Sequence, residues 1–254
     1  MRGGTVRRGF LQAFGLWLLS VLRPGMSRAA ATAPAEPDDD AFTSTNLLLA
    51  SLSDSDLAER RVQPVDIGDV VITSGRIRAC DPLAYPDFSP LARSVPPGHY
   101  PVRIYFALGR VAAAMMRFAP GVPATWESAR VTATPDYKAM PQGGYPVDAG
   151  MGAYMDADAL AQMGRRIDKV KADTGSDSVN YYDDVVAEEV EAHDGEWTLH
   201  QPMPDNALNA AIFHSGWGDG YYPVLWGLSA DGQPLVLLTD FFVIADADGR
   251  KEPE

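Results

Sequence analysis

Five closely spaced prolines limit what the middle of this 254-residue chain can form. Pro82, Pro86, Pro90, Pro96 and Pro97 each lack a backbone N–H and have a fixed φ. Because a long helix or a central strand tolerates neither restriction, we expect turns in this region. The segments on both sides are short, so the sequence predicts brief elements joined by turns.

Runs of β-branched and aromatic residues predict a mostly antiparallel sheet. Residues 65–72 and 76–80, separated by Thr73, Ser74 and Gly75, indicate a hairpin. A tight connection through Gly109 and Arg110 favours a second pair of strands at 100–108 and 111–118. Further strands are expected at 125–134, 145–155, 207–214, 221–228 and 234–244, the last two joined by Asp231 and Gly232 in a type I′ turn.

Three segments have helical signals. The leucine spacing in residues 46–61 predicts a short helix, with Ser53 or Asp54 as a cap partway along. Residues 156–171 begin with acidic and end with basic side chains, which matches a helix dipole, and residues 178–193 are acidic on one face. The sum is a single α+β domain with a mostly antiparallel sheet and two or three helices.

The N-terminal region predicts export by the twin-arginine route. Arg7 and Arg8 precede an apolar run at 13–22, which is too short to span a bilayer. Cleavage is expected after Ala31 or after Ala35. The alternative is an ordinary secretory signal with a chance arginine pair. Both interpretations predict a periplasmic or extracellular protein without stable membrane insertion, and the first makes the twin-arginine translocase a partner.

Composition restricts the partners of the mature chain. Removing residues 1–35 takes away five arginines and no acidic residue, which leaves 16 basic against 34 acidic residues and a formal charge of −18. Such a surface repels phosphate backbones and anionic lipids, so we expect no nucleic acid partner, whereas a cation or a basic protein would be attracted. The alternative is that this charge serves solubility alone.

The predicted organisation is a signal peptide at 1–35, a leader and short helix at 36–64, a domain at 65–244 and a tail at 245–254. The mature chain is long enough to bury a core without disulfides. Cys80 is the only cysteine, which excludes an intramolecular disulfide, and we expect it to be buried.

Several short motifs follow one another along most of the mature chain. They are residues 74–77 (SGRI), 79–83 (ACDPL), 98–102 (GHYPV), 147–150 (VDAG), 214–220 (HSGWGDG) and 239–241 (TDF). Together they resemble the bacterial family known as domain of unknown function 4241, over roughly residues 65–244. The resemblance implies a shared fold and brings no catalytic residue, cofactor or substrate. The export signal lies outside it.

The glycine-rich loop at 215–220 is the first candidate site. Its three glycines permit a sharp bend that presents Trp217 beside Asp219, and His214 and Ser215 lead into it. Such a loop suits a ligand contact. The alternative is a tight connection between strands, in which the tryptophan fills the core and the aspartate caps backbone amides.

Aspartates at the ends of predicted strands form the second candidate. If two of Asp81, Asp148 and Asp240 converge with Asp219, they would bind a cation or act as an acid and base pair. The alternative is that they form turns. A nucleophile interpretation would combine Cys80 or Ser215 with His99 or His214, although the nucleophile-elbow pattern is missing.

Other chemistries have little support in the sequence. The four histidines, at 99, 193, 200 and 214, show no close helical pair, so no zinc site is expected. Asp246, Asp248 and Gly249 mimic the start of a calcium loop, but the chain ends before its bidentate glutamate. No phosphate-binding glycine loop follows a predicted strand, so a nucleotide cofactor has no support, and the sequence does not identify any other cofactor.

The sequence therefore favours an exported binding module that contacts a ligand or a basic protein through the 215–220 loop. The alternative is a cell-envelope hydrolase that uses aspartates, with His214 or a divalent cation, and a purely structural protein is a third possibility. The candidate binding residues are Asp81, Asp148, His214, Ser215, Trp217, Asp219 and Asp240.

Overall fold

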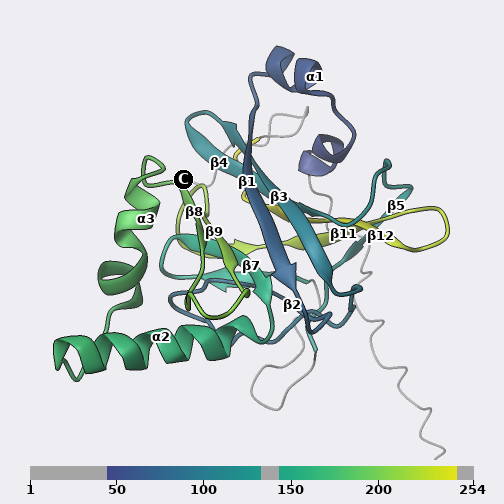
Figure 1. Ribbon diagram of the computed structural model, residues 1–254. Coiled ribbons are helices and arrows are strands. Elements are labelled where there is room, and N and C mark those ends of the chain that lie inside the picture. Colours follow the sequence, from purple (N-terminus) through teal and green to yellow (C-terminus); the bar gives the residue numbers. More distant parts are fainter. Residues whose placement is uncertain (1–44, 133–142, 245–254) are drawn as a thin grey trace, which may run out of the picture. The chain divides into compact units, whose positions relative to one another are not determined.

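The computed structural model describes residues 45–132 and 143–244 (Figure 1). The predicted signal peptide with Arg7 and Arg8, the end of the strand expected at 125–134, and the calcium-like segment at 246–249 lie outside the described residues.

Two antiparallel sheets make up most of the described chain, which confirms the predicted α+β class. The larger sheet has six strands in the order β1 (Gln63–Ile72), β3 (Gly98–Ala107), β4 (Arg110–Arg117), β12 (Pro234–Asp240), β11 (Val224–Leu228) and β5 (Thr125–Ser128). The smaller sheet has the order β2 (Ile77–Cys80), β7 (Met151–Asp156), β9 (Ala210–His214) and β8 (Trp197–His200). A separate pair joins β10 (Gly220–Tyr222) to β6 (Tyr145–Val147).

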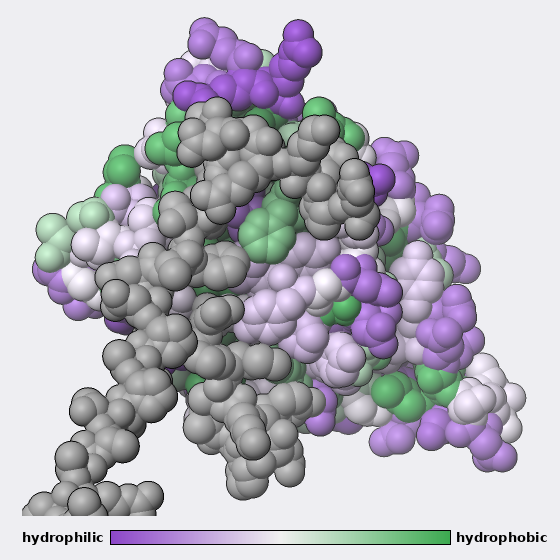
Figure 2. Space-filling model, turned by 180° about the vertical axis from the view of Figure 1, so that it is seen from behind, coloured by the Kyte–Doolittle hydropathy of each residue, from purple (hydrophilic) through white to green (hydrophobic). Residues whose placement is uncertain are grey.

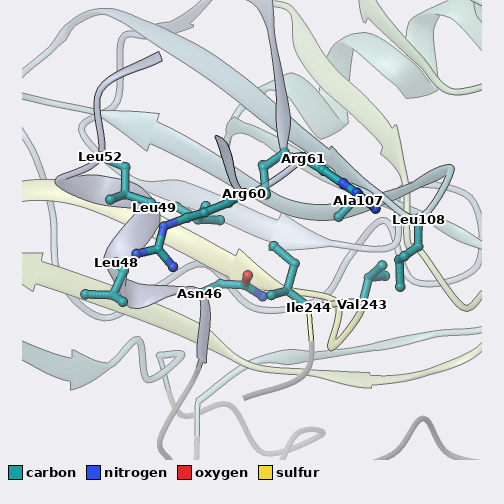
Figure 3. Close-up of a pocket in the computed structure, with 11 residues that line it drawn as sticks. Asn46, Leu48, Leu49, Leu52, Arg60, Arg61, Ala107, Leu108, Val243 and Ile244 are labelled. Atoms are coloured by element: carbon teal, nitrogen blue, oxygen red, sulfur yellow. The ribbon is translucent and has the colours of Figure 1, made fainter. Parts of the chain in front are cut away.

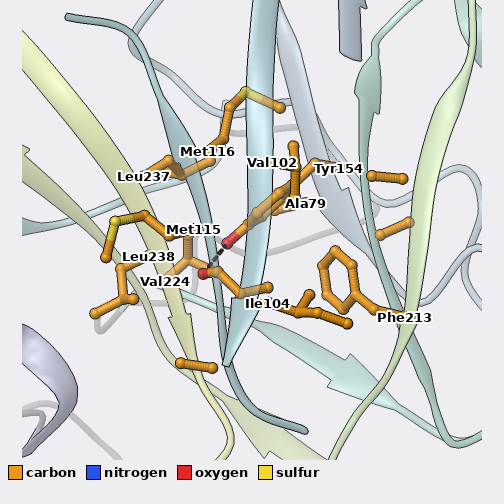
Figure 4. Packing of buried hydrophobic residues seen from close by; sticks show 14 of the residues in the cluster. Ala79, Val102, Ile104, Met115, Met116, Tyr154, Phe213, Val224, Leu237 and Leu238 are labelled. Carbon is orange, nitrogen blue, oxygen red and sulfur yellow. Dashed lines mark hydrogen bonds between the residues drawn. The ribbon is translucent and has the colours of Figure 1, made fainter. Parts of the chain in front are cut away.

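The two sheets pack against each other through a buried apolar layer (Figure 4). Tyr154 of β7 crosses this layer, and its hydroxyl donates to the carbonyl of Ala114 on β4 at 3.0 Å. The same hydroxyl shares a 2.7 Å hydrogen bond with Thr239 of β12. Because these polar groups satisfy one another inside the core, they fix how the sheets lie without leaving an unpaired dipole.

Short helices lie at the edges of the sheets. They are η2 (Thr45–Ala50), α1 (Asp54–Glu59), α2 (Ala159–Thr174), the π-helical η3 (Tyr182–Val186) and α3 (Ala187–Glu191). The helix predicted at 46–61 is therefore two helices. The second starts where Ser53 accepts from the Asp56 amide and the Asp56 carboxylate accepts from the Ser53 amide, which confirms Ser53 as a cap.

The predicted hairpin at 65–80 is wrong. Strand β1 pairs with β3 in the larger sheet, and β2 pairs with β7 in the smaller one. Buried Asp156 explains the separation, because its Oδ2 accepts from the amides of Thr73 (2.6 Å) and Ser74 (2.7 Å). Those amides are thereby directed to a carboxylate rather than across a hairpin, and the chain passes from one sheet to the other.

Several other boundaries also differ from the prediction. Asp156 belongs to β7, so α2 begins at Ala159 without an acidic first turn. The segment 145–155 divides at a turn that includes Gly150, and 221–228 divides at Pro223, which lacks the N–H needed to continue a ladder. At the final turn only Gly232 has positive φ, so the turn is not type I′, and β12 ends at Asp240. Strand β8 was not predicted.

Strands β3 and β4 pair with each other, which confirms the tight connection predicted between residues 100–108 and 111–118. The turn itself consists of Leu108 and Gly109 rather than Gly109 and Arg110. Cys80 is buried, as expected.

Candidate functional site

Asp81 ties together two motif segments. The side chain is fully buried at the end of β2. Its Oδ1 accepts from the amides of Leu83 (2.9 Å) and Ala84 (3.0 Å). Its Oδ2 accepts from the amides of Asp148 (2.9 Å) and Ala149 (2.8 Å). Both oxygens are thus engaged by backbone donors, and the carboxylate holds the two turns next to each other.

Asp240, at the end of β12, is also a buried carboxylate that accepts hydrogen bonds. It is fully buried, and its Oδ1 accepts from the Phe242 amide at 2.9 Å and from the side-chain amide of Asn46. Asp148 and Asp219, in contrast, are exposed. Within residues 45–132 and 143–244, no hydrogen bond links Asp219 to another of the candidate aspartates.

The 215–220 loop is held from inside. Buried Ser215 donates its hydroxyl to the Gly218 carbonyl at 2.8 Å, and the Tyr222 hydroxyl donates to the same carbonyl at 3.0 Å. The Ser215 amide donates to the Gly150 carbonyl at 3.0 Å, which connects the loop to the 147–150 motif. At Gly216, φ is +68°, and a Cβ there would lie 2.7 Å from a carbonyl oxygen of β4. The loop is therefore preorganised and requires glycine at 216.

Trp217 packs against the body of the protein. The Arg110 guanidinium lies 4.4 Å from the centre of the indole ring and also donates to the Gly216 carbonyl at 3.1 Å. The indole N–H donates to the Phe242 carbonyl at 3.4 Å, and the side chain is half-buried. These contacts are of the kind that holds a loop in place, since a cation over an aromatic face and a ring N–H bond each restrain the ring.

A cavity of 430 Å³ lies at the other end of this loop. We call it the His214 cavity. It is lined by Leu83, Ala84, Ala149, Met151, Asn180, Tyr182, Gly195 and His214. Leu83 and Ala149 come from the two turns that Asp81 holds together, and His214 is half-buried at the end of β9. Three motif segments that are far apart in the chain thus contribute to one cavity.

A hydrogen-bonded series of side chains next to the lining residue Tyr182 was missed by sequence reasoning. Buried His200 contacts the Tyr181 hydroxyl through Nε2 and the Glu189 carboxylate through Nδ1, each at 2.8 Å. Burial raises the pKa of the Tyr181 phenol. Tyr181 directly precedes Tyr182, so this series fixes the π-helical turn that supplies one wall of the cavity. The three residues come from separate elements, and their spacing in the sequence gave no signal.

The proposed nucleophiles are poorly disposed for attack. Burial raises the pKa of the Cys80 thiol to about 12, which is the opposite of activation. The Ser215 hydroxyl is directed to a carbonyl, and His99 is exposed on β3. In the part of the chain that the structure describes, no three potential ligands cluster as a metal site would require. Among those same residues, no helix is long and apolar enough to cross a membrane.

Comparison with protein families identifies the family of this chain. The model of the family described as "Protein of unknown function (DUF4241)" covers residues 70–239, more than half of the chain. The chain belongs to this family. Curated proteins and solved structures yield no match. The described residues that line the His214 cavity all lie within the matched DUF4241 region, as does the loop that His214 leads into.

Proposed function

We propose that this protein is exported by the twin-arginine route and binds a small molecule in the His214 cavity, without chemical turnover. The observation that supports the proposal is the convergence of three DUF4241 motif segments on one cavity. Its volume of 430 Å³ falls within the range of about 300–1,000 Å³ that is usual for small-molecule sites. The binding site is then at the His214 end of the loop, and the Trp217 end supports it.

The lining suggests an uncharged or cationic ligand with both polar and apolar parts. Leu83, Ala149 and Met151 supply apolar surface, whereas His214 and Asn180 carry hydrogen-bonding groups. Among residues 45–132 and 143–244, no arginine or lysine lines the cavity to pair with an anion. The predicted charge of −18 for the mature chain also disfavours anions.

Binding has more support than hydrolysis by aspartates. A catalytic carboxylate needs an oxygen that reaches the substrate or a water molecule. Asp81 uses both oxygens on four backbone amides, and Asp240 is fully buried and accepts from the Phe242 amide. We therefore assign the two buried aspartates to holding loops and not to proton transfer.

Native mass spectrometry tests the proposed ligand site. The protein would be recovered from the envelope fraction of the organism that makes it, and its native mass compared with its denatured mass. We expect an excess mass in the wild type that the His214→Ala variant loses. The matched control is His99→Ala, which removes an exposed histidine on β3 and should retain the excess. Retention in His214→Ala, or a bare wild type, would contradict the assignment.

The same denatured mass tests export. Cleavage after Ala31 predicts Thr32 as the first residue, and the double variant Arg7→Lys, Arg8→Lys should remain uncleaved in the cytoplasm. Normal processing of that variant would exclude the twin-arginine route.

A further inference from the structure

A second and larger cavity is lined by residues of η2, by the residues that directly follow α1, and by the turn between β3 and β4 (Figure 3). We call it the Arg60 cavity. Its volume is 590 Å³. Much of its lining is aliphatic, including Leu48, Leu49, Leu52, Val62, Leu108 and Val243. In Figure 2, the end of the molecule formed by α1 is hydrophilic, with hydrophobic residues directly below it.

Two cations stand at this apolar cavity. Arg60 and Arg61 both line it and are exposed. Neither forms a salt bridge with any residue in 45–132 or 143–244. Their charge complements an anionic group placed at the cavity mouth.

Arg61 occupies a backbone position that favours glycine. The Val62 amide donates to the Leu57 carbonyl at 2.9 Å, and the Arg61 amide donates to the Ala58 carbonyl at 3.0 Å. This is the Schellman pattern at the end of α1, in which the left-handed residue is usually glycine or asparagine. Arg61 takes that position with φ +58°. The chain therefore carries a long cationic side chain where local structure does not favour one.

Leu108, which also lines the cavity, is a second non-glycine residue in the left-handed conformation. It forms the two-residue turn between β3 and β4 with Gly109, and their φ values are +53° and +74°. Such a turn favours asparagine or aspartate before the glycine. Leu108 is also 76% exposed, so its apolar side chain gains little from burial in this state. Backbone strain of this kind is found at sites that hold a ligand. Here the two strained residues, Arg61 and Leu108, place one cation and one apolar side chain at the same cavity.

We propose that the Arg60 cavity binds a long-chain carboxylate such as a free fatty acid. The acyl chain would lie along Leu49, Leu52 and Val243, with Leu108 closing over it. The carboxylate would accept hydrogen bonds from Arg60 and Arg61 at the mouth. This site is separate from the His214 cavity and does not depend on it.

Calorimetric titration with oleate tests this proposal on the mature chain after bound lipid has been removed by hydrophobic exchange chromatography. We expect saturable binding at a single site. Oleyl alcohol, which has the same chain without the charge, should bind at least about tenfold more weakly, since hydrogen bonds to charged groups contribute that much.

Two variants separate the loss of a ligand contact from the loss of folding. Arg61→Asn should weaken oleate at least about tenfold and leave oleyl alcohol unchanged. Leu108→Asn should weaken both ligands about tenfold, because apolar contact is lost. Both changes put asparagine at left-handed positions, where it is well tolerated, so neither variant should unfold.

The matched control is Asp194→Asn. Asp194 is also a left-handed residue, with φ +57°, but it does not line the Arg60 cavity. It should bind oleate like the wild type. The proposal is overturned if the wild type shows no saturable oleate binding, or if Arg61→Asn binds oleate with unchanged affinity.

Discussion

The two cavities differ in which part of the chain builds them. Of the residues that the structure describes, all those that line the His214 cavity lie within the family match at 70–239. Of the described residues that line the Arg60 cavity, only Ala107 and Leu108 lie within the match, and the other nine precede residue 70 or follow residue 239. The first cavity is thus a feature of the DUF4241 region, whereas the second arises where flanking segments pack onto that region.

The two cavities also differ in what holds their walls. Around the His214 cavity, a buried carboxylate and loop carbonyls receive hydrogen bonds from three motif segments. Around the Arg60 cavity, aliphatic packing dominates, and left-handed residues stand at the rim. A hydrogen-bonded wall fails when one acceptor is removed, while an aliphatic wall tolerates change more gradually.

The largest effect is expected from Asp81→Ala. Four backbone amides would lose their acceptor in a buried site, which should lower the free energy of unfolding by about 4 kcal/mol or more. Urea denaturation would measure the loss. The control is Asp148→Ala, because that exposed side chain accepts none of these bonds and should change stability by less than about 0.5 kcal/mol. Equal effects of the two changes would contradict a hydrogen-bonded wall at the His214 cavity.

Gly216→Ala should come next, at the point where the two regions touch. An added Cβ would lie 2.9 Å from Val243 Cγ2, which belongs to the Arg60 cavity, and 2.7 Å from the Val111 carbonyl. With φ at +68°, we expect a loss of about 2–3 kcal/mol in urea denaturation. Gly218→Ala has positive φ but no neighbour within 4 Å, so it should cost only about 1 kcal/mol. If both glycines cost the same, close packing at 216 does not matter.

Alkaline pH should weaken the framework of the His214 cavity. The pKa of the Cys80 thiol is about 12 in the folded protein, above its ordinary value of 9.0, so the unfolded chain releases this proton first. The stability that the buried thiol contributes is then complete below about pH 9 and is lost as pH rises towards 12. Between pH 8 and pH 10, the wild type should lose about 1.4 kcal/mol more than Cys80→Ala. Parallel pH profiles would show that burial does not raise the pKa of the Cys80 thiol in the folded protein.

The smallest effect is expected at the rim of the Arg60 cavity. Leu108→Asn should raise the free energy of unfolding by about 0.5–1 kcal/mol, because asparagine suits the left-handed turn position and little apolar surface is lost. Thermal unfolding of the ligand-free protein would measure this. A loss of stability would mean that Leu108 contributes to folding, and the functional explanation for its strained position would fall.

Much of the sheet was predictable because alternating runs and turn residues act locally. Strand β4 and the cap at Ser53 follow from such signals. The pairing of β1 and β2 with different sheets did not, because it depends on Asp156, which is remote in sequence from the amides it binds. An acidic residue at the end of an apolar strand is the only local hint of that role.

The candidate site was predictable only in part. The motif segments that were singled out do meet, through Asp81 and the Gly150 carbonyl. The acceptor roles of Asp81 and Asp240 depend on burial and on distant amides, which no spacing shows. The Arg60 cavity combines residues of η2 and those that follow α1 with the turn near residue 108, a long-range arrangement that periodicity does not encode.

Hydrogen–deuterium exchange would test the central claim, that the DUF4241 region carries its own small-molecule site. The protein recovered from the envelope fraction would be compared with the same protein after unfolding, dialysis and refolding. We predict that the recovered form is more protected at residues 81–84, 147–151, 180–182 and 212–216, the peptides that form and hold the His214 cavity. Identical exchange of these peptides in the two forms, with any protection confined to 46–62 and 107–108, would contradict the account.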